Sequence, residues 1–375
     1  MNTTDHTQHQ DVLRMKQALG LARNALWITS PNPRVGCVLV GASGEIIGIG
    51  STQAAGQAHA EVMALKDAAI KGKSAQGATA YVTLEPCAHQ GRTGPCCDAL
   101  ISAGVARVVA SLQDPNPLVG GQGFERLKAA GVEVNVGLGA GESRELNLGF
   151  LSRLIRKRPW VRMKIAASLD GATALRNGQS QWITGPEARA DGHLWRARAC
   201  AVMTGSGTVL ADNPVLNVRG VATPRQPHLV LIDSSLRTPL NAALWSEERK
   251  VFVYGANDVD GRQHALTKHS AVVKLLQGAP CKVDLAAVMH ELAMQEINEL
   301  HVEAGYTLSG ALLDAGLVDE LLVYMAPKLL GSGKGMALLQ EKLALSEALQ
   351  LQFRDVQLVG EDVRLLARVA GSDAF

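Results

Sequence analysis

Apolar positions along the chain switch repeatedly between helical and strand spacing. Met15 and Leu19 begin an apolar series with steps of three or four residues, which predicts an amphipathic helix from Asp11 that ends before Pro31. Residues 35–40 form a continuous apolar run and predict a buried strand. Residues 1–10 are polar, and we expect them to form a disordered tail.

The alternation continues to the end of the chain and predicts an α/β fold with helices covering the sheets. Further strands are expected at residues 45–48, 78–84, 105–112, 132–136, 161–166, 199–204, 229–233, 251–254, 272–275, 299–303, 320–326, 349–359 and 363–369. Further helices are expected at residues 58–70, from Cys96 onward, and at 124–130, 142–158, 187–198, 285–295 and 307–315.

A chain of 375 residues is too long for one ordinary domain, and two is the expected number. The helix over residues 142–158 ends in a basic cluster before Pro159, which is typical of a helix C-terminus and a domain joint. We therefore place a first domain at residues 11–153 and a second at residues 154–375.

Composition narrows the classes of function. Lys+Arg 37 against Asp+Glu 35 is nearly balanced and no basic block occurs, which argues against nucleic acid as the main partner. No apolar run is long enough to span a bilayer and the N-terminus lacks a signal-peptide core, so we expect a cytoplasmic protein without a membrane partner. Three of the six cysteines lie within eleven residues, which indicates a metal site rather than a disulfide framework.

Two short stretches carry the pattern of a zinc deaminase. His59-Ala60-Glu61 reads H-x-E, and Pro86-Cys87 with Cys96 supplies P-C and a second cysteine. In this pattern His59, Cys87 and Cys96 bind the metal, and Glu61 is a catalytic proton shuttle rather than a ligand. Zinc with three protein ligands keeps a position for water and lowers the pKa of that water.

A closed structural zinc site is the main alternative for such a cluster. It would need a fourth ligand, which Cys97 or His89 could supply. A structural site does not require Glu61, so an open catalytic site is favoured. If Cys96 and Cys97 both begin one helix, their side chains diverge by about 100°, and only one of them can point at the metal. Comparison of the spacing with that of other zinc-binding helices of this kind favours Cys96 as the ligand.

The loop between the two cysteines carries a resemblance to a known family. Eight residues separate Cys87 from Cys96, where pyrimidine nucleoside and tRNA deaminases have two. With the Pro31-to-Gly36 stretch and Asp114-Pro115-Asn116-Pro117, the chain resembles the bifunctional pyrimidine deaminase/reductase of riboflavin biosynthesis over nearly all its length after residue 10. It departs from many relatives at Ala88, Gln90 and Gly94, none of which zinc binding or proton transfer needs.

The resemblance implies a cytidine-deaminase-like three-layer αβα domain followed by a dihydrofolate-reductase-like α/β domain. It implies zinc-dependent deamination of 2,5-diamino-6-(5-phosphoribosylamino)pyrimidin-4(3H)-one and NADPH-dependent reduction of the ribosyl side chain, giving 5-amino-6-(5-phosphoribitylamino)uracil. Candidates for the ring, ribose and phosphate of the deaminase substrate are Asn32, His89, Arg92, Asp114 and Asn116. Ordinary turn chemistry is the alternative for each of them.

The reductase resemblance rests on four stretches of the second half, residues 163–171, 180–184, 204–214 and 303–311. The fourth is a strand running through glycine into a helix, a turn that can bind phosphate, although no G-x-G-x-x-G is present. The resemblance assigns NADPH to Ala166, Trp182, Thr208, Asp212, Ser234, Gly305, Tyr306, Thr307, Leu308, Ser309, Gly310 and Ala311. It assigns substrate to Ser180, Arg196, Leu216, Arg219 and Glu303, and leaves Lys164 and Asp212 as groups for a proton or orientation role.

Two other functions compete with the bifunctional enzyme. A nucleic-acid deaminase with an accessory domain would need basic, aromatic-bearing channels, and only 4% of the residues are aromatic. A zinc-stabilised binding module without catalysis would have no use for Glu61. The expected partners of the bifunctional enzyme are its small-molecule substrate and further copies of the chain, with a homodimer favoured.

Overall fold

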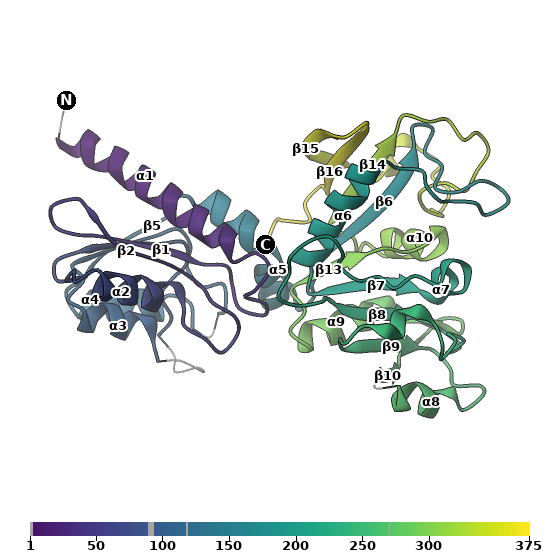
Figure 1. The fold of residues 1–375 in the computed structure, drawn as a ribbon, viewed down its shortest axis with the longest axis horizontal. Helices are drawn as coiled ribbons and strands as arrows, with labels where there is room; N and C mark the ends of the chain where they lie inside the picture. Colours follow the sequence, from purple (N-terminus) through teal and green to yellow (C-terminus); the bar gives the residue numbers. More distant parts are fainter. Residues whose placement is uncertain (1–2, 89–93, 118, 270) are drawn as a thin grey trace. The chain divides into compact units, whose positions relative to one another are not determined.

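The structure is a computed structural model that describes residues 3–88, 94–117, 119–269 and 271–375 (Figure 1). The chain divides into two compact units, Met1–Arg156 and Lys157–Phe375. The division lies three residues beyond the joint placed at residue 153 from the sequence.

The first unit is built on a five-stranded sheet in the order β2-β1-β3-β4-β5. Strand β1 pairs antiparallel with both of its neighbours, whereas β3, β4 and β5 run parallel. Its strands are β1 Gly36–Val40, β2 Ile46–Ser51, β3 Thr79–Val82, β4 Arg107–Ala110 and β5 Glu133–Val136. Its helices are α1 Thr3–Asn24, α2 Ala60–Ile70, α3 Cys96–Ser102, α4 Gln122–Ala129 and α5 Ala140–Arg156.

Both faces of this sheet are buried, which makes the unit a three-layer αβα sandwich (Figure 1). Along β1, Cys37 and Leu39 pack with the layer of α2, α3 and α4, while Val38 and Val40 pack with α1 and α5. Successive side chains of a strand point to opposite faces, so an unbroken apolar run fits a strand covered on both sides.

The second unit contains a nine-stranded sheet in the order β10-β9-β8-β7-β13-β6-β14-β16-β15. The strands from β10 to β14 in this order are parallel, and an antiparallel hairpin of β16 and β15 completes the edge. Its strands are β6 Trp160–Ser168, β7 Ala201–Gly205, β8 His228–Ile232, β9 Val251–Gly255, β10 Ala271–Leu275, β13 Glu299–Val302, β14 Glu320–Ala326, β15 Leu351–Val359 and β16 Asp362–Val369, with a separate small hairpin of β11 Gln277–Gly278 and β12 Lys282–Val283.

Helices cover both faces of the parallel part of this sheet. Alternate residues of β6, such as Met163 and Ile165, pack with α9 and α10, whereas Leu322 and Tyr324 of β14 pack with α6 on the opposite face. The helices are α6 Pro186–Arg198, α7 Ser206–Asp212, α8 Arg262–Lys268, α9 Leu285–Met294 and α10 Tyr306–Asp314, with 3-10 turns η1 Ala243–Ser246 and η2 Leu345–Glu347. None of the helices in the described ranges is long and apolar enough to cross a membrane.

Several local expectations need correction. Helix α1 already includes Thr3, so residues 3–10 are helical and not the disordered tail expected from their polarity. No glycine or proline interrupts the chain between Thr3 and Leu19, and a helix that packs through its C-terminal half can continue through polar turns. The one-turn to two-turn helices α7 and α8 and the β11–β12 hairpin were not expected, because elements this short leave little periodicity to read.

Candidate functional site

The predicted metal ligands come together in the first unit. The ligand atoms of His59, Cys87 and Cys96 all lie within 4.8 Å of one another. His59 Nδ1 is 3.3 Å from Cys96 Sγ and 3.6 Å from Cys87 Sγ. One imidazole nitrogen and two sulfurs converging on one point form a donor set that fits zinc, and three protein ligands leave a fourth position open.

Local structure explains why these three residues meet. His59 is the N-cap of α2, and Cys96 is the first residue of α3, so two helix N-termini face the cluster. Helix α2 lies directly on β2, since a Cβ at Gly50 would fall 2.3 Å from the carbonyl oxygen of Ala60. Cys87 follows β3 through Pro86, and the backbone N–H of Cys96 donates to Cys87 Sγ at 3.4 Å. Such N–H groups stabilise thiolate.

The electrostatics of the cluster favour the metal-binding protonation state at one of its three ligands, Cys87. Contact with the thiol of Cys96 and with His59 lowers the pKa of Cys87 to about 4, although burial opposes the shift. The same contact, together with burial, raises the pKa of Cys96. Metal binding releases such protons from its ligands.

Glu61 lies at the cluster without being one of its ligands. Its side chain is 3% exposed and contacts the thiol of Cys96. Burial, followed by the charge of Cys87, raises the pKa of Glu61 to about 7. The cluster therefore has a buried carboxyl group beside it that can hold or release a proton.

Cys97 lies outside the ligand cluster. Its side chain packs in the apolar core of the first unit, and its Sγ is 3.7 Å from Asp98 Oδ1. Burial raises the pKa of Cys97 to about 11. Among the described residues, the group consists of His59, Cys87 and Cys96, and His89, the other candidate for a fourth ligand, lies outside the described residues.

The other deaminase candidates occupy two turns of the same unit. The turn with Asn32 is held by α5, since Asn147 Oδ1 accepts from the Arg34 N–H and Arg153 donates to the carbonyl of Pro31. In the turn after β4, Asp114 Oδ1 accepts from the N–H of Asn116 at 2.8 Å. His89 and Arg92 lie outside the described residues.

The cofactor candidates of the second unit gather at one edge of its sheet. Ala166 lies near the end of β6, Ser234 follows β8, and Thr208 lies in α7, directly after β7. Residues 305–311 follow β13 into α10. These strands are parallel neighbours, so their carboxyl ends meet at the edge where α/β sheets bind ligands. A Cβ on Gly305 would lie 3.4 Å from Thr208 Oγ1, which shows that the loops after β13 and β7 touch.

Two of the reductase substrate candidates, Arg196 and Glu303, lie in one charged cluster with Lys164. Arg196 of α6 directs Nε and Nη2 at the two carboxylate oxygens of Glu303, at 2.7 and 2.9 Å. Lys164 Nζ is 4.0 Å from the same carboxylate. Burial would raise the pKa of Glu303, but Arg196, His301 and Lys164 hold it well below its usual range. Burial lowers the pKa of Lys164, although Glu303 opposes the shift.

The pairing changes the expectation for the two arginines. The sequence suggested that both guanidinium groups suit a sugar phosphate, but the fork of Arg196 is used by Glu303 and by the carbonyl of Asn217. Arg219 is exposed and donates one bond to Asn217 Oδ1 at 2.6 Å. Of the two, Arg219 has more donors left for a phosphate. Leu216 lies just before Asn217 and is buried, with φ 55°.

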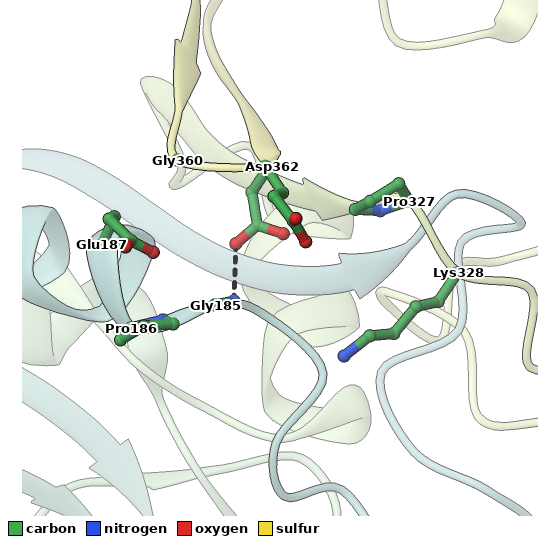
Figure 2. Close-up of a pocket in the computed structure, with 8 residues that line it drawn as sticks. Gly185, Pro186, Glu187, Pro327, Lys328, Gly360 and Asp362 are labelled. Carbon is green, nitrogen blue, oxygen red and sulfur yellow. Dashed lines mark hydrogen bonds between the residues drawn. The ribbon is translucent and has the colours of Figure 1, made fainter.

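Side chains from the C-terminal part of the second unit hold the backbone of the segment that contains Ser180 and Trp182. Lys328 Nζ donates to the carbonyl oxygens of Trp182 and Ile183 at 3.3 and 2.7 Å, and Asp362 Oδ2 accepts from the N–H of Gly185 at 2.7 Å. Lys328 and Asp362 both line a cavity of about 290 Å³ beside this segment (Figure 2). The Trp182 ring is 64% exposed, with the guanidinium of Arg189 4.6 Å from its centre. Asp212, the last residue of α7, is also exposed.

Sequence reasoning missed three residues that the structure places beside the sites. They are Glu85 next to the metal-binding turn, His193 beside Arg196 and Arg219, and Lys328, which donates to the backbone carbonyl of Trp182. His193 Nδ1 accepts from the N–H of Arg219 at 3.2 Å, and burial with the two arginines lowers the pKa of His193 to about 4. The sequence could have indicated Glu85, because this residue directly precedes the P-C motif. No motif in the sequence points to His193 or Lys328.

Comparison with known proteins gives the same division of the chain. Residues 8–112 match the family "Cytidine and deoxycytidylate deaminase zinc-binding region", and residues 159–365 match the family "RibD C-terminal domain". The riboflavin biosynthesis protein RibD of Escherichia coli K12 is 48% identical over 368 residues, which cover 95% of this chain and 98% of that protein. The RibD protein of Aquifex aeolicus is 40% identical, over 93% of this chain and 96% of that protein.

Solved structures agree over both units. Acinetobacter baumannii RibD, form 1, has a TM-score of 0.87 and 42% identity, and covers 96% of this chain and 99% of that one. A Thermotoga maritima protein described as a diaminohydroxyphosphoribosylaminopyrimidine deaminase/5-amino-6-(5-phosphoribosylamino)uracil reductase has a TM-score of 0.84 and 30% identity, with coverages of 97% and 100%.

These matches confirm the expected fold class, a cytidine-deaminase-like unit followed by a dihydrofolate-reductase-like unit. They also confirm the expected cofactors, zinc and NADPH. The zinc-binding family model spans His59, Cys87 and Cys96, which lie together in the structure, and the second family model is that of the RibD reductase domain. The chain belongs to the RibD family of riboflavin biosynthesis enzymes, in which a zinc-binding deaminase domain is joined to an NADPH-dependent reductase domain.

Proposed function

We propose that the chain first deaminates 2,5-diamino-6-(5-phosphoribosylamino)pyrimidin-4(3H)-one and then reduces the ribosyl side chain of the product. The observation that carries the proposal is the His59, Cys87 and Cys96 cluster with Glu61 in contact, within a chain that matches the Thermotoga maritima deaminase/reductase over 97% of its length. The first product, 5-amino-6-(5-phosphoribosylamino)uracil, is the compound after which the reductase of that relative is named.

In the deaminase step, water adds to C2 of the ring, the carbon whose amino group is lost. His59, Cys87 and Cys96 would hold zinc, which supplies Lewis-acid activation of that water when it is bound. Glu61 takes a proton from the water and delivers it to the amine as the carbon–nitrogen bond breaks. Ammonia leaves and the carbon becomes a carbonyl. Asn32, Asp114 and Asn116, with His89 and Arg92, bind the ring and the ribosyl phosphate.

In the reductase step, the open-chain form of the ribosylamine accepts two electrons at its first sugar carbon. NADPH supplies the hydride, and a proton goes to the adjoining nitrogen, so that a ribityl group results. Ala166, Trp182, Thr208, Asp212, Ser234 and residues 305–311 orient the cofactor. Arg219, Ser180, Leu216 and the Arg196–Glu303 pair orient the substrate, and Lys164 donates its proton or fixes the sugar near Glu303.

The test is incubation of the purified protein with the diaminopyrimidinone ribosyl phosphate, with and without NADPH. The proposal predicts ammonia release without NADPH, and oxidation of NADPH only once deaminated product has formed. Oxidation of NADPH on the diaminopyrimidinone ribosyl phosphate with no ammonia released would reverse the order of reactions and contradict the proposal.

We further propose that the chain forms a homodimer in the cytoplasm, where reduced thiols can bind zinc. Strand β15 lies at the edge of its sheet, and its bulge between Phe353 and Asp355 puts Leu351, Phe353, Val356 and Leu358 on one face. Their exposed fractions of 40% to 72% are large for apolar side chains. An open edge strand with such a face can pair with a second copy. Sedimentation equilibrium should give a dimer for the native chain and a monomer for Phe353→Asp; a monomeric native chain contradicts the proposal.

A further inference from the structure

Glu85 is a buried carboxylate that accepts hydrogen bonds from four backbone N–H groups. Its side chain is 5% exposed. Oε2 accepts from the N–H groups of Asp114 and Gly121, both at 2.9 Å. Oε1 accepts from Gly123 at 2.8 Å and from Phe124 at 3.4 Å. A carboxyl group whose two oxygens both accept from backbone N–H groups fixes the position of each donor strongly.

The sequence around these donors is shaped to reach Glu85. A Cβ on Gly123 would lie 2.0 Å from the carbonyl oxygen of Pro86, and one on Gly120 would lie 2.4 Å from that of Asp114. Gly121 has φ 88°, in the region that favours glycine. The three glycines of Gly120-Gly121-Gln122-Gly123 therefore allow the loop and the start of α4 to close around Glu85.

This arrangement joins two parts of the deaminase site. Glu85 is two residues before the metal ligand Cys87, and its bond to Asp114 reaches the turn over residues 114–117. Asp114 Oδ1 in turn accepts from the N–H of Asn116. On the other side, Arg126 of α4 pairs with Asp98 of α3 at 2.7 Å, so the helix whose first turn contacts Glu85 is also tied to the helix of Cys96.

We propose that Glu85 is a positioning residue of the deaminase, which sets the distance between the metal-binding turn and the turn that carries Asp114 and Asn116. The proposal rests on the proposed function, in which that turn binds the ribosyl phosphate while the pyrimidine ring reacts at the metal. A substrate held at both ends is sensitive to that distance, because misplacement by about 1 Å can cost a hundredfold in rate.

The experiment compares Glu85→Gln with Glu125→Gln, the same change at an exposed position in the first turn of α4. In Glu85→Gln, an amide NH₂ replaces one oxygen and faces two N–H donors. We expect a KM for the diaminopyrimidine substrate raised about tenfold or more, a smaller change in kcat, one zinc per chain, and unchanged reductase kinetics on the deaminated substrate. Glu125→Gln should leave all four quantities unchanged.

A second variant reaches the same bonds from the loop. Gly121→Ala strains the left-handed backbone that brings its N–H to Glu85, without touching the metal-binding turn, and should raise KM in the same way. A KM within twofold of the native value in both variants overturns the proposal. Loss of zinc in Glu85→Gln also overturns it, since Glu85 would then support the metal-binding turn alone.

Asn116→Ala separates this proposal from the function on which it rests. If the turn binds substrate, Asn116→Ala raises KM by itself, and the double variant with Glu85→Gln shows less than the product of the two single effects. An unchanged KM in Asn116→Ala shows that this residue has no part in substrate binding. Such a result contradicts the proposed function at Asn116, while the KM of Glu85→Gln still decides the role of Glu85.

Discussion

The two units place their chemistry at opposite kinds of position. In the first unit the reactive groups lie at the N-termini of two helices, α2 and α3, where free N–H groups stabilise sulfur anions. In the second unit they lie beyond the carboxyl ends of parallel strands, in loops brought together by the strand order. The candidate metal ligands of the first site come from neighbouring segments, and the candidate cofactor residues of the second come from segments far apart in the sequence.

This difference determines how much of each activity depends on single residues. A metal site needs each ligand, so one lost sulfur removes the activity. In the reductase the hydride comes from NADPH, and the protein orients it through many contacts of modest strength. Changes in the first unit should therefore abolish one activity, whereas most changes in the second should weaken the other by degrees.

The largest expected effect separates Cys96 from its neighbour Cys97. Cys96→Ser removes a metal ligand, so zinc should be lost and ammonia release should fall to background. Cys97→Ser changes a core residue outside the cluster and should keep both zinc and ammonia release. Zinc content and initial rates measure the contrast. Equal loss of zinc in the two variants would contradict the assignment of ligands.

The next effect is on stability in the second unit. Glu303→Gln leaves the mostly buried Arg196 without its carboxylate, which should cost about 3 kcal/mol of unfolding free energy and most of the reductase activity. Four of the five tryptophans, Trp160, Trp182, Trp195 and Trp245, lie in the second unit, so urea unfolding followed by tryptophan fluorescence reports on it. Glu341→Gln, at an exposed site, is the control. A cost equal to that of the control would show that the ion pair contributes nothing.

A smaller effect is expected at His193, whose Nδ1 accepts from the N–H of Arg219. His193→Phe loses this acceptor and should raise the reductase KM about tenfold, the equivalent of one hydrogen bond. His193→Asn keeps an acceptor near the same place and should restore most of the loss. Deaminase kinetics in the same chain are the internal control. If His193→Asn and His193→Phe raise the reductase KM equally, the hydrogen bond is not the reason for the effect.

The last effect concerns pH and His228. Burial, followed by Arg225, Lys250 and Arg249, lowers the pKa of His228 to about 4. The unfolded chain therefore binds a proton that the folded chain does not between about pH 6.5 and pH 4, and stability falls as pH falls through this window. One proton corresponds to at most about 1.4 kcal/mol per pH unit. The urea midpoint of His228→Gln should fall less steeply on acidification; identical slopes would exclude this histidine as a cause.

The structure brings together the three residues that the sequence indicates as zinc ligands, and their signal is strong because zinc ligands are chemically distinctive and lie close along the chain. His59 and Glu61 are two residues apart, and Cys87 and Cys96 are nine apart. The choice between Cys96 and Cys97 depended on where α3 begins and on the direction of each side chain. Glu85 went unnoticed because its partners are backbone N–H groups up to 39 residues away, and residue types do not reveal such bonds.

The second site was predicted only through resemblance. Arg196 and Glu303 are 107 residues apart, and no spacing rule pairs them. The sheet itself followed from the alternation of strands and helices, but the strand order that places β13 between β7 and β6 did not. The domain joint near residue 153 stays a prediction, based on a helix with a basic end before a proline.

The measurement that tests the account most directly is made on Glu61→Gln. The variant keeps the size of the side chain and removes its ability to carry a proton, so zinc should stay bound. We predict that ammonia release from the diaminopyrimidinone ribosyl phosphate falls by about 10²-fold to 10⁴-fold, while NADPH oxidation with the deaminated substrate keeps its native rate. Full ammonia release with zinc bound would contradict the role of Glu61 as the proton carrier, and an equal loss of both activities would contradict two separate sites on one chain.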